Sequence, residues 1–209
     1  RQARLPALHS QQLQSVLEKF SRVPMRLADL ASEKIYATQH WNETLAQKDG
    51  TIRRDTGFTA EPNELILSGP LFNVANPLYQ TPKAICDTNR AYDCLDLTTL
   101  PDGYLPRTNY RPDLSVDEYR ARTPKVPWGE KLPTTDFYRV ACRRQLNQAG
   151  ERTLIPMIAT PKTGHVDGVL TITIEDVSIS TQIAGLWSAV PFDFFVKTTG
   201  KGDIRNELA

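Results

Sequence analysis

Arginines, lysines and side-chain amides carry most of the chemical capacity of this 209-residue sequence. Its three histidines, His9, His40 and His165, have no histidine at i+4 and no cysteine partner, so the spacing of a zinc site is missing. We expect each to be a surface or capping residue. The sequence also contains no phosphate-binding glycine loop, nucleophile elbow or dinucleotide fingerprint. We therefore predict no catalytic residue, no metal ligand and no cofactor held by this chain.

The short loop Asn76-Pro77-Leu78-Tyr79 is close to a catalytic motif. Amino-group methyltransferases grip a flipped adenine with an Asn-Pro-Pro-Tyr loop, but here leucine occupies the third position. No glycine-rich strand–turn–helix for S-adenosylmethionine precedes it. We therefore expect a structural Asn-Pro turn.

The segment Pro106–Arg111 has side chains that suit nucleic-acid recognition. Arg107 and Arg111 can bind guanine edges or phosphate, Asn109 can bond to adenine in a bidentate manner, and Tyr110 can stack on a base. The alternative is a proline-flanked loop whose arginines pair with the acidic segment 87–96.

A second group of candidates begins in the expected strand 137–144. Its alternation places Tyr138, Val140 and Cys142 on a core face, and Arg139, Ala141 and Arg143 on the opposite, exposed face. Gly200 and Gly202 would allow the backbone near them to approach phosphate. The further candidates for nucleic-acid contact are Arg144, Lys197, Lys201 and Arg205. A salt-bridged strand and a solvated helix end are the alternatives.

Charge is segregated along the chain, although the formal net charge is only +1. Residues 1–54 contain nine basic residues against five acids, and residues 139–165 contain five against one. Residues 55–100 contain two basic residues against six acids. Local basic patches decide whether phosphate is bound. The mild net charge argues against a sequence-blind polyanion binder and permits a selective one.

Cysteine content and hydropathy bound the protein class. Cys86, Cys94 and Cys142 lack metal-ligand spacing, so we expect buried, reduced thiols in a cytoplasmic protein; a Cys86–Cys94 disulfide is the alternative. No apolar run approaches the roughly 20 residues that cross a bilayer, and we expect no membrane partner.

Periodicity predicts helices first and strands later. Leu13, Val16, Leu17 and Phe20 follow helical spacing, and a second helix is expected over 27–41. Six prolines between 101 and 133 predict a long loop, which one short helix with a Ser115/Glu118 capping box interrupts. Strands are expected at 64–67, 137–144, 152–159 and 169–174, with a helix over 179–190 that Pro191 kinks or restarts.

Three stretches, in this order, carry a family resemblance. They are Phe137-Tyr-Arg-Val-Ala-Cys-Arg-Arg144, Glu151-Arg-Thr-Leu-Ile-Pro-Met-Ile-Ala-Thr-Pro161 and Pro191-Phe-Asp-Phe-Phe-Val-Lys-Thr-Thr-Gly-Lys-Gly-Asp203. This series resembles the target-recognition (TaqI-like specificity) region of type II N6-adenine DNA methyltransferases and single-chain restriction–modification enzymes. Residues 41–50 and 66–82 resemble stretches of large members of the same group. The resemblance implies sequence-specific recognition of double-stranded DNA for a catalytic methyltransferase domain of the same polypeptide. S-adenosylmethionine would be bound by that domain, which is absent from this chain.

We therefore predict an α+β fold: a helical connector over residues 1–60, then a mixed-sheet DNA target-recognition domain over 61–209 with a long proline-rich loop and a C-terminal helix. The alternative function is a protein-interaction module of a phage-defence complex. Its expected signature is an exposed apolar patch on the helices of residues 8–45.

Overall fold

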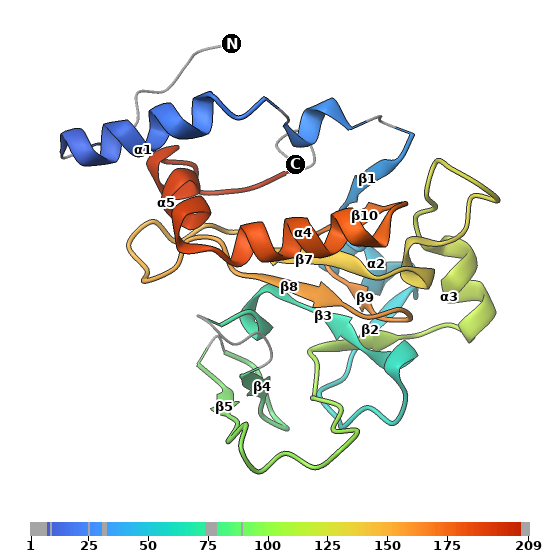
Figure 1. The fold of residues 1–209 in the computed structure, drawn as a ribbon. Coiled ribbons are helices and arrows are strands. Elements are labelled where there is room, and N and C mark those ends of the chain that lie inside the picture. Colours follow the sequence, from blue (N-terminus) through green and yellow to red (C-terminus); the bar gives the residue numbers. More distant parts are fainter. Residues whose placement is uncertain are drawn as a thin grey trace.

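The computed structural model describes residues 8, 10–24, 26–30, 33–73, 79–88 and 90–205. Helices, a first sheet, a second sheet and a two-stranded ribbon follow one another as layers (Figure 1). The fold is α+β, as predicted. Within the described residues, no helix is both long and apolar enough to cross a membrane. The helices are α1 (Gln11–Ser21), α2 (Glu43–Lys48), α3 (Val116–Arg122), α4 (Val177–Ser188) and α5 (Val190–Thr198).

The first sheet is antiparallel throughout and has the strand order β1-β10-β7-β8. Its strands are β1 (Ile35–Thr38), β10 (Val169–Ile174), β7 (Arg139–Arg143) and β8 (Pro156–Ala159). The second sheet has the order β2-β6-β3-β9, with β3 and β9 parallel. Its strands are β2 (Ile52–Arg54), β6 (Tyr110–Pro112), β3 (Ile66–Leu67) and β9 (Gly164–His165). The ribbon consists of β4 (Gln80–Pro82) and β5 (Tyr92–Cys94).

Both faces of the first sheet are covered. On one face, Val140, Cys142 and Ile172 pack with Trp187 of α4. On the other face, Ala141 and Val169 belong to a second apolar cluster together with Leu67, Leu71 and Phe72. All six residues of β10 are buried, so its threonines are not solvent-facing despite the alternating pattern.

Several predicted elements are confirmed. Strands β7 and β10 lie within the expected ranges, and α3 begins with both halves of the Ser115/Glu118 capping box. Pro191 lies in the first turn of α5, where its missing N–H costs no hydrogen bond, so it restarts the helix after α4.

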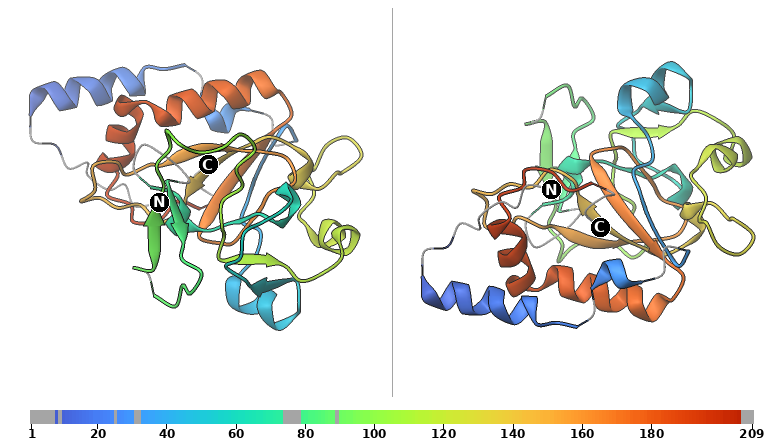
Figure 2. Two further views of the ribbon diagram at one scale, coloured as in Figure 1. Left: turned by 90° about the horizontal axis from the view of Figure 1, so that it is seen from below. Right: turned by 90° about the horizontal axis from the view of Figure 1, so that it is seen from above.

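The predicted second helix over 27–41 is wrong, because Leu27–Asp29 is one 3-10 turn and Ile35–Thr38 is β1. Strand β1 pairs with β10 and β2 pairs with β6, so both strands belong to sheets, and only α2 lies between them as a helix. A helical connector over residues 1–60 therefore does not describe this part of the chain. Figure 2 shows α1 and α2 at opposite ends of the molecule.

Of the predicted connector, the amphipathic helix α1 is present, with its apolar residues along one side. Its apolar residues are half-buried, none fully, and Phe20 contacts Phe192 and Phe195 of α5 at ring-centroid distances of 6.5 and 5.3 Å. The cysteines are unpaired; Cys86 and Cys142 are buried as expected, whereas Cys94 is exposed, contrary to expectation.

Candidate nucleic-acid interface

The end of β7 and the C-terminal tail form one surface. Beyond Arg143, the chain leaves the sheet and pairs with the tail: the Leu146 N–H donates to the Gly202 carbonyl at 3.0 Å, and the Ile204 N–H donates to the Arg144 carbonyl at 2.9 Å. Residues 143–147 and 201–205, which we call the basic tail surface, therefore lie side by side although more than fifty positions separate them in sequence.

This surface contains four of the ten predicted contact residues, namely Arg143, Arg144, Lys201 and Arg205, against the single acid Asp203. The Nε atoms of Arg144 and Arg205 lie 3.0 and 2.9 Å from the Asp203 carboxylate. Arg143 and Lys201 form no ion pair within the part of the chain that the structure describes. Asp203 offsets only one of the four positive charges, so the surface remains basic.

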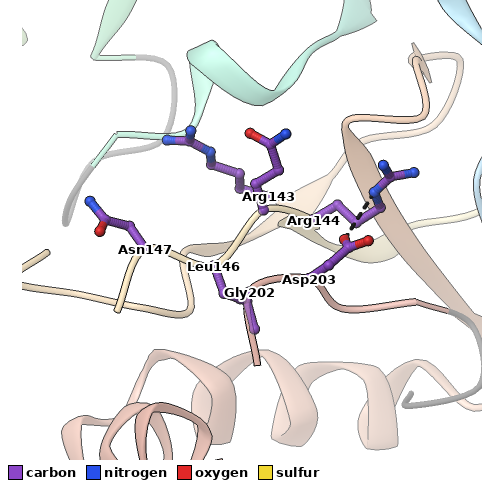
Figure 3. Close-up of a pocket in the computed structure, with 7 residues that line it drawn as sticks. Arg143, Arg144, Leu146, Asn147, Gly202 and Asp203 are labelled. Atoms are coloured by element: carbon purple, nitrogen blue, oxygen red, sulfur yellow. Dashed lines mark ion pairs between the residues drawn. The ribbon is translucent and has the colours of Figure 1, made fainter. Parts of the chain in front are cut away.

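An open depression of about 400 Å³ lies in the basic tail surface (Figure 3). Arg143 and Arg144 extend from the same short segment in different directions, and only Arg144 turns toward Asp203 (Figure 3). The lining residues are Arg143, Arg144, Gln145, Leu146, Asn147, Gly202 and Asp203. Leu146 is buried and belongs to the core cluster on the α4 side of the first sheet.

Gln145 and Asn147 are exposed in this depression and were not among the sequence candidates. Asn147 is partly committed, because its side-chain oxygen accepts the Ala149 N–H at 3.1 Å. For the Gln145 side chain, no hydrogen bond is recorded among the described residues. The sequence did contain a signal for them. Gln145 and Asn147 follow Arg143 at every second position, which continues the alternation of β7 beyond its last residue.

Asp193 joins the second and third resemblance stretches. Its buried carboxylate accepts the N–H groups of Thr153 and Leu154 at 2.9 and 2.6 Å and lies 3.5 Å from Arg152 Nε. Lys197, on the same helix α5, donates to the Gly150 carbonyl at 2.8 Å. Asp193 of the Phe-Asp-Phe segment thus fixes the loop 150–154, which follows residues 143–147 in sequence. Lys197 holds the start of the same loop.

Arg139 is not a surface residue, and its predicted exposed orientation is wrong. Its side chain lies in the layer between the two sheets with 1% of its surface exposed. The guanidinium donates to the carbonyl and hydroxyl of Thr163, while Nε and Nη1 have no partner within the described residues. Burial lowers the pKa of Arg139 to about 10. Without unfolding, this side chain cannot reach a base or a phosphate.

The predicted positions of His40 and His165 are also wrong. Their rings stack at a centroid distance of 3.8 Å beside Arg139, and His165 is fully buried. His40 bonds to the Thr134 hydroxyl, and His165 bonds to the Thr171 hydroxyl, both at 2.9 Å. Burial, reinforced by the Arg139 cation, lowers the pKa of His165 to about 3 and holds that of His40 well below its usual value. No spacing in the sequence indicates this cluster. His9 lies outside the described residues.

In the segment Pro106–Arg111, Asn109 and Tyr110 are buried and bonded within the fold. Asn109 is 3% exposed, and its side-chain oxygen accepts bonds from Ser68 and Tyr92 hydroxyls at 2.8 and 3.0 Å. Tyr110 is buried and its hydroxyl contacts Glu43 at 3.3 Å. The predicted reading of adenine by Asn109 and stacking by Tyr110 are therefore wrong for this conformation.

The two arginines of that segment are engaged as well. Arg111 lies 3.7 Å from Asp55 and 4.0 Å from Glu64. These acids lie outside segment 87–96, so the alternative expectation holds only in that Arg111 is paired within the fold. Arg107 lies over the ring of Phe58 at 4.2 Å and is half-buried.

Residues that could hold a metal ion are not assembled in the described part of the chain. No cluster of three or more histidine, cysteine, aspartate or glutamate residues there could hold a metal ion. Asn76, Pro77 and Leu78 lie outside the described residues, so the expected Asn-Pro turn stays a prediction.

Comparison with known proteins adds no family to this geometry. No protein-family model matches the sequence, and no curated protein matches it. Any functional assignment therefore depends on the residues of this chain and their arrangement.

Proposed function

We propose that this protein binds double-stranded DNA in a sequence-selective manner, as the target-recognition part of an N6-adenine DNA methyltransferase or restriction–modification enzyme. One observation carries the proposal: Arg143 and Arg144 line an open depression, and backbone pairing brings residues 201–205, with Lys201 and Arg205, beside them. The stretches that resemble the family meet there too, because α5 anchors the 150–154 loop and its tail pairs with the end of β7.

Phosphates and bases would be contacted by different side chains. Arg143 and Lys201 are free of ion pairs among the described residues, so they suit phosphate contacts that position the duplex. Gln145 is exposed, lines the same depression as Arg143, and carries both a donor and an acceptor, the combination that reads adenine in the major groove. Arg144 is oriented by Asp203, which limits its motion.

The chemistry on the DNA would belong to another part of the enzyme. In this proposal, a catalytic methyltransferase domain of the same polypeptide holds S-adenosylmethionine and the target adenine. The described residues contribute recognition only. A protein-interaction module receives less support, since the apolar stripe of α1 faces α5 through Phe20.

The proposal is tested by the dependence of duplex binding on salt. Fluorescence anisotropy with a labelled duplex should give a binding constant that falls with salt, with a slope of about −0.9 per phosphate contacted. Arg143→Ala and Lys201→Ala should each weaken binding to all sequences and reduce the slope by about one. Lys48→Ala, which removes an exposed lysine of α2, is the matched control and should change neither quantity.

Selectivity is tested separately by selection from random-sequence duplexes. We expect enrichment of one motif by the wild type, and relaxation at one adenine position by Gln145→Ala, which should cost about 1–3 kcal/mol there. Binding without any enriched motif would contradict selective recognition. Equal loss of affinity for Lys48→Ala and Lys201→Ala would contradict the assignment of the surface.

A further inference from the structure

Phe58 is a large apolar side chain that the fold holds in solvent. Its side chain lies in the connection after β2, and 60% of the residue's surface is exposed. Single exposed apolar residues are common and need no explanation by themselves. Phe58 differs because the backbone around it is fixed from several directions.

The backbone clamp comes from three polar groups. The Asp55 carboxylate accepts the Gly57 N–H at 2.9 Å, and the Asp55 N–H donates to the Asn109 carbonyl at 3.3 Å. Arg111 donates to the Phe58 carbonyl while it is paired with Asp55. A Cβ at Gly57 would lie 3.1 Å from Asp55 and 3.3 Å from Arg111, so this position has little room for a larger residue.

The ring has a cationic neighbour on one of its faces. Phe58 forms an isolated antiparallel bridge with Arg107, and the Arg107 guanidinium lies over the ring at 4.2 Å. This cation–π contact fixes the orientation of the ring and leaves the remaining ring surface accessible. A rigid, one-sided aromatic platform loses little entropy when a planar group stacks on it.

We propose that Phe58, supported by Arg107, is a stacking platform for an unpaired base of DNA. The exposed ring, with its orientation fixed by the Arg107 guanidinium, presents a small flat π surface, which fits a single planar ligand. Every base has a π face, so the contact is tolerant of sequence. The inference rests on the proposed DNA binding, and it assigns to Phe58 a role that none of the predicted contact residues fills.

The experiment compares two DNAs that differ in one base. One is a fully paired duplex, and the other contains the same sequence with one bulged 2-aminopurine. The intact 209-residue chain should quench 2-aminopurine fluorescence and prefer the bulged duplex. Phe58→Ala should weaken binding to the bulged duplex by roughly 10- to 100-fold, abolish the quenching, and change binding to the paired duplex by less than about twofold. Phe58→Trp should retain both properties.

The control is Val177→Ala, which truncates a comparably exposed apolar residue (61%) on α4 and should match the wild type in every assay. Melting curves check that the variants fold. If the wild type binds paired duplex but Phe58→Ala still quenches 2-aminopurine and keeps full affinity for the bulge, the stacking inference alone is overturned. If the wild type binds neither DNA at low salt, the proposed function fails, and the inference fails with it.

Discussion

Strands β6 and β7 both carry arginines that the sequence marks as candidates for DNA contact, yet the two strands use them differently. Around β6, Arg111 pairs with acids and Arg107 stacks on Phe58. Along β7, Arg139 is sealed between the sheets, whereas Arg143 and Arg144 reach an open surface. The difference follows strand position: within β7, the side chain at the start is covered by the second sheet, and those at the end extend beyond it. In and after β7, an arginine side chain is thus accessible to a partner only at the end of the strand.

The largest effect on stability is expected for Arg139→Ala, which tests the burial of this side chain. Removing the buried side chain leaves a cavity and leaves the Thr163 acceptors unpaired, so we expect a loss of about 3 kcal/mol in unfolding free energy. Arg139→Met fills a similar volume without a buried charge and should cost less than about 1 kcal/mol. Unfolding in guanidinium chloride measures the unfolding free energy of both variants. Arg139→Met should retain full DNA affinity; loss of affinity in a folded Arg139→Met protein would show that the residue contacts DNA after all.

The second test is acid titration of the buried cluster next to Arg139. The folded-state pKa of His165 is about 3, below its unfolded value near 6.5, so the unfolded chain binds more protons between these values. Stability is therefore fully present above about pH 6.5 and falls as pH is lowered toward 3. The expected slope is about 1.4 kcal/mol per pH unit from this histidine, and His40 adds to it in the same direction.

Urea unfolding at pH 7, 6, 5 and 4 measures this slope. His165→Gln should reduce it by about one proton relative to the wild type, whatever its effect on stability at pH 7. An unchanged slope in His165→Gln would mean that the ring is protonated in the folded protein, which contradicts its burial.

The smallest effect is expected on the β6 side, for Asn109→Ala. The hydroxyls of Ser68 and Tyr92 would lose their shared acceptor, at a cost of about 1–2 kcal/mol of stability. Once folded, the variant should select the same DNA motif as the wild type, because Asn109 does not reach solvent. Sequencing of duplexes selected by both proteins measures this. A motif that changes only in Asn109→Ala would restore Asn109 as a base-reading residue and break the contrast between the two strands.

Predictability from sequence varied with the range of the interactions involved. The capping box before α3, the restart at Pro191 and the strand Val169–Ile174 depend on neighbours within a few residues, and all three were predictable. The helix expected over 27–41 was not a helix, because pairing of Ile35–Thr38 with β10 outweighs a weak local helical pattern. The alternation around β7 correctly places Val140 and Cys142 in the core, but Tyr138, expected on the same face, is 53% exposed. It also missed that the opposite face is covered.

The sequence by itself determined the α+β class, the candidate basic residues and the absence of a recognisable catalytic motif. Each follows from residue type and short-range periodicity. Only the tertiary structure decided which arginines are accessible, since pairing of residues 144–146 with 202–204 creates one basic surface and the second sheet buries Arg139. The same long-range packing stacks His40 on His165 and presents Phe58 on Arg107. Burial and charge pairing are properties of contacts between distant segments, so no local pattern in the chain specifies them.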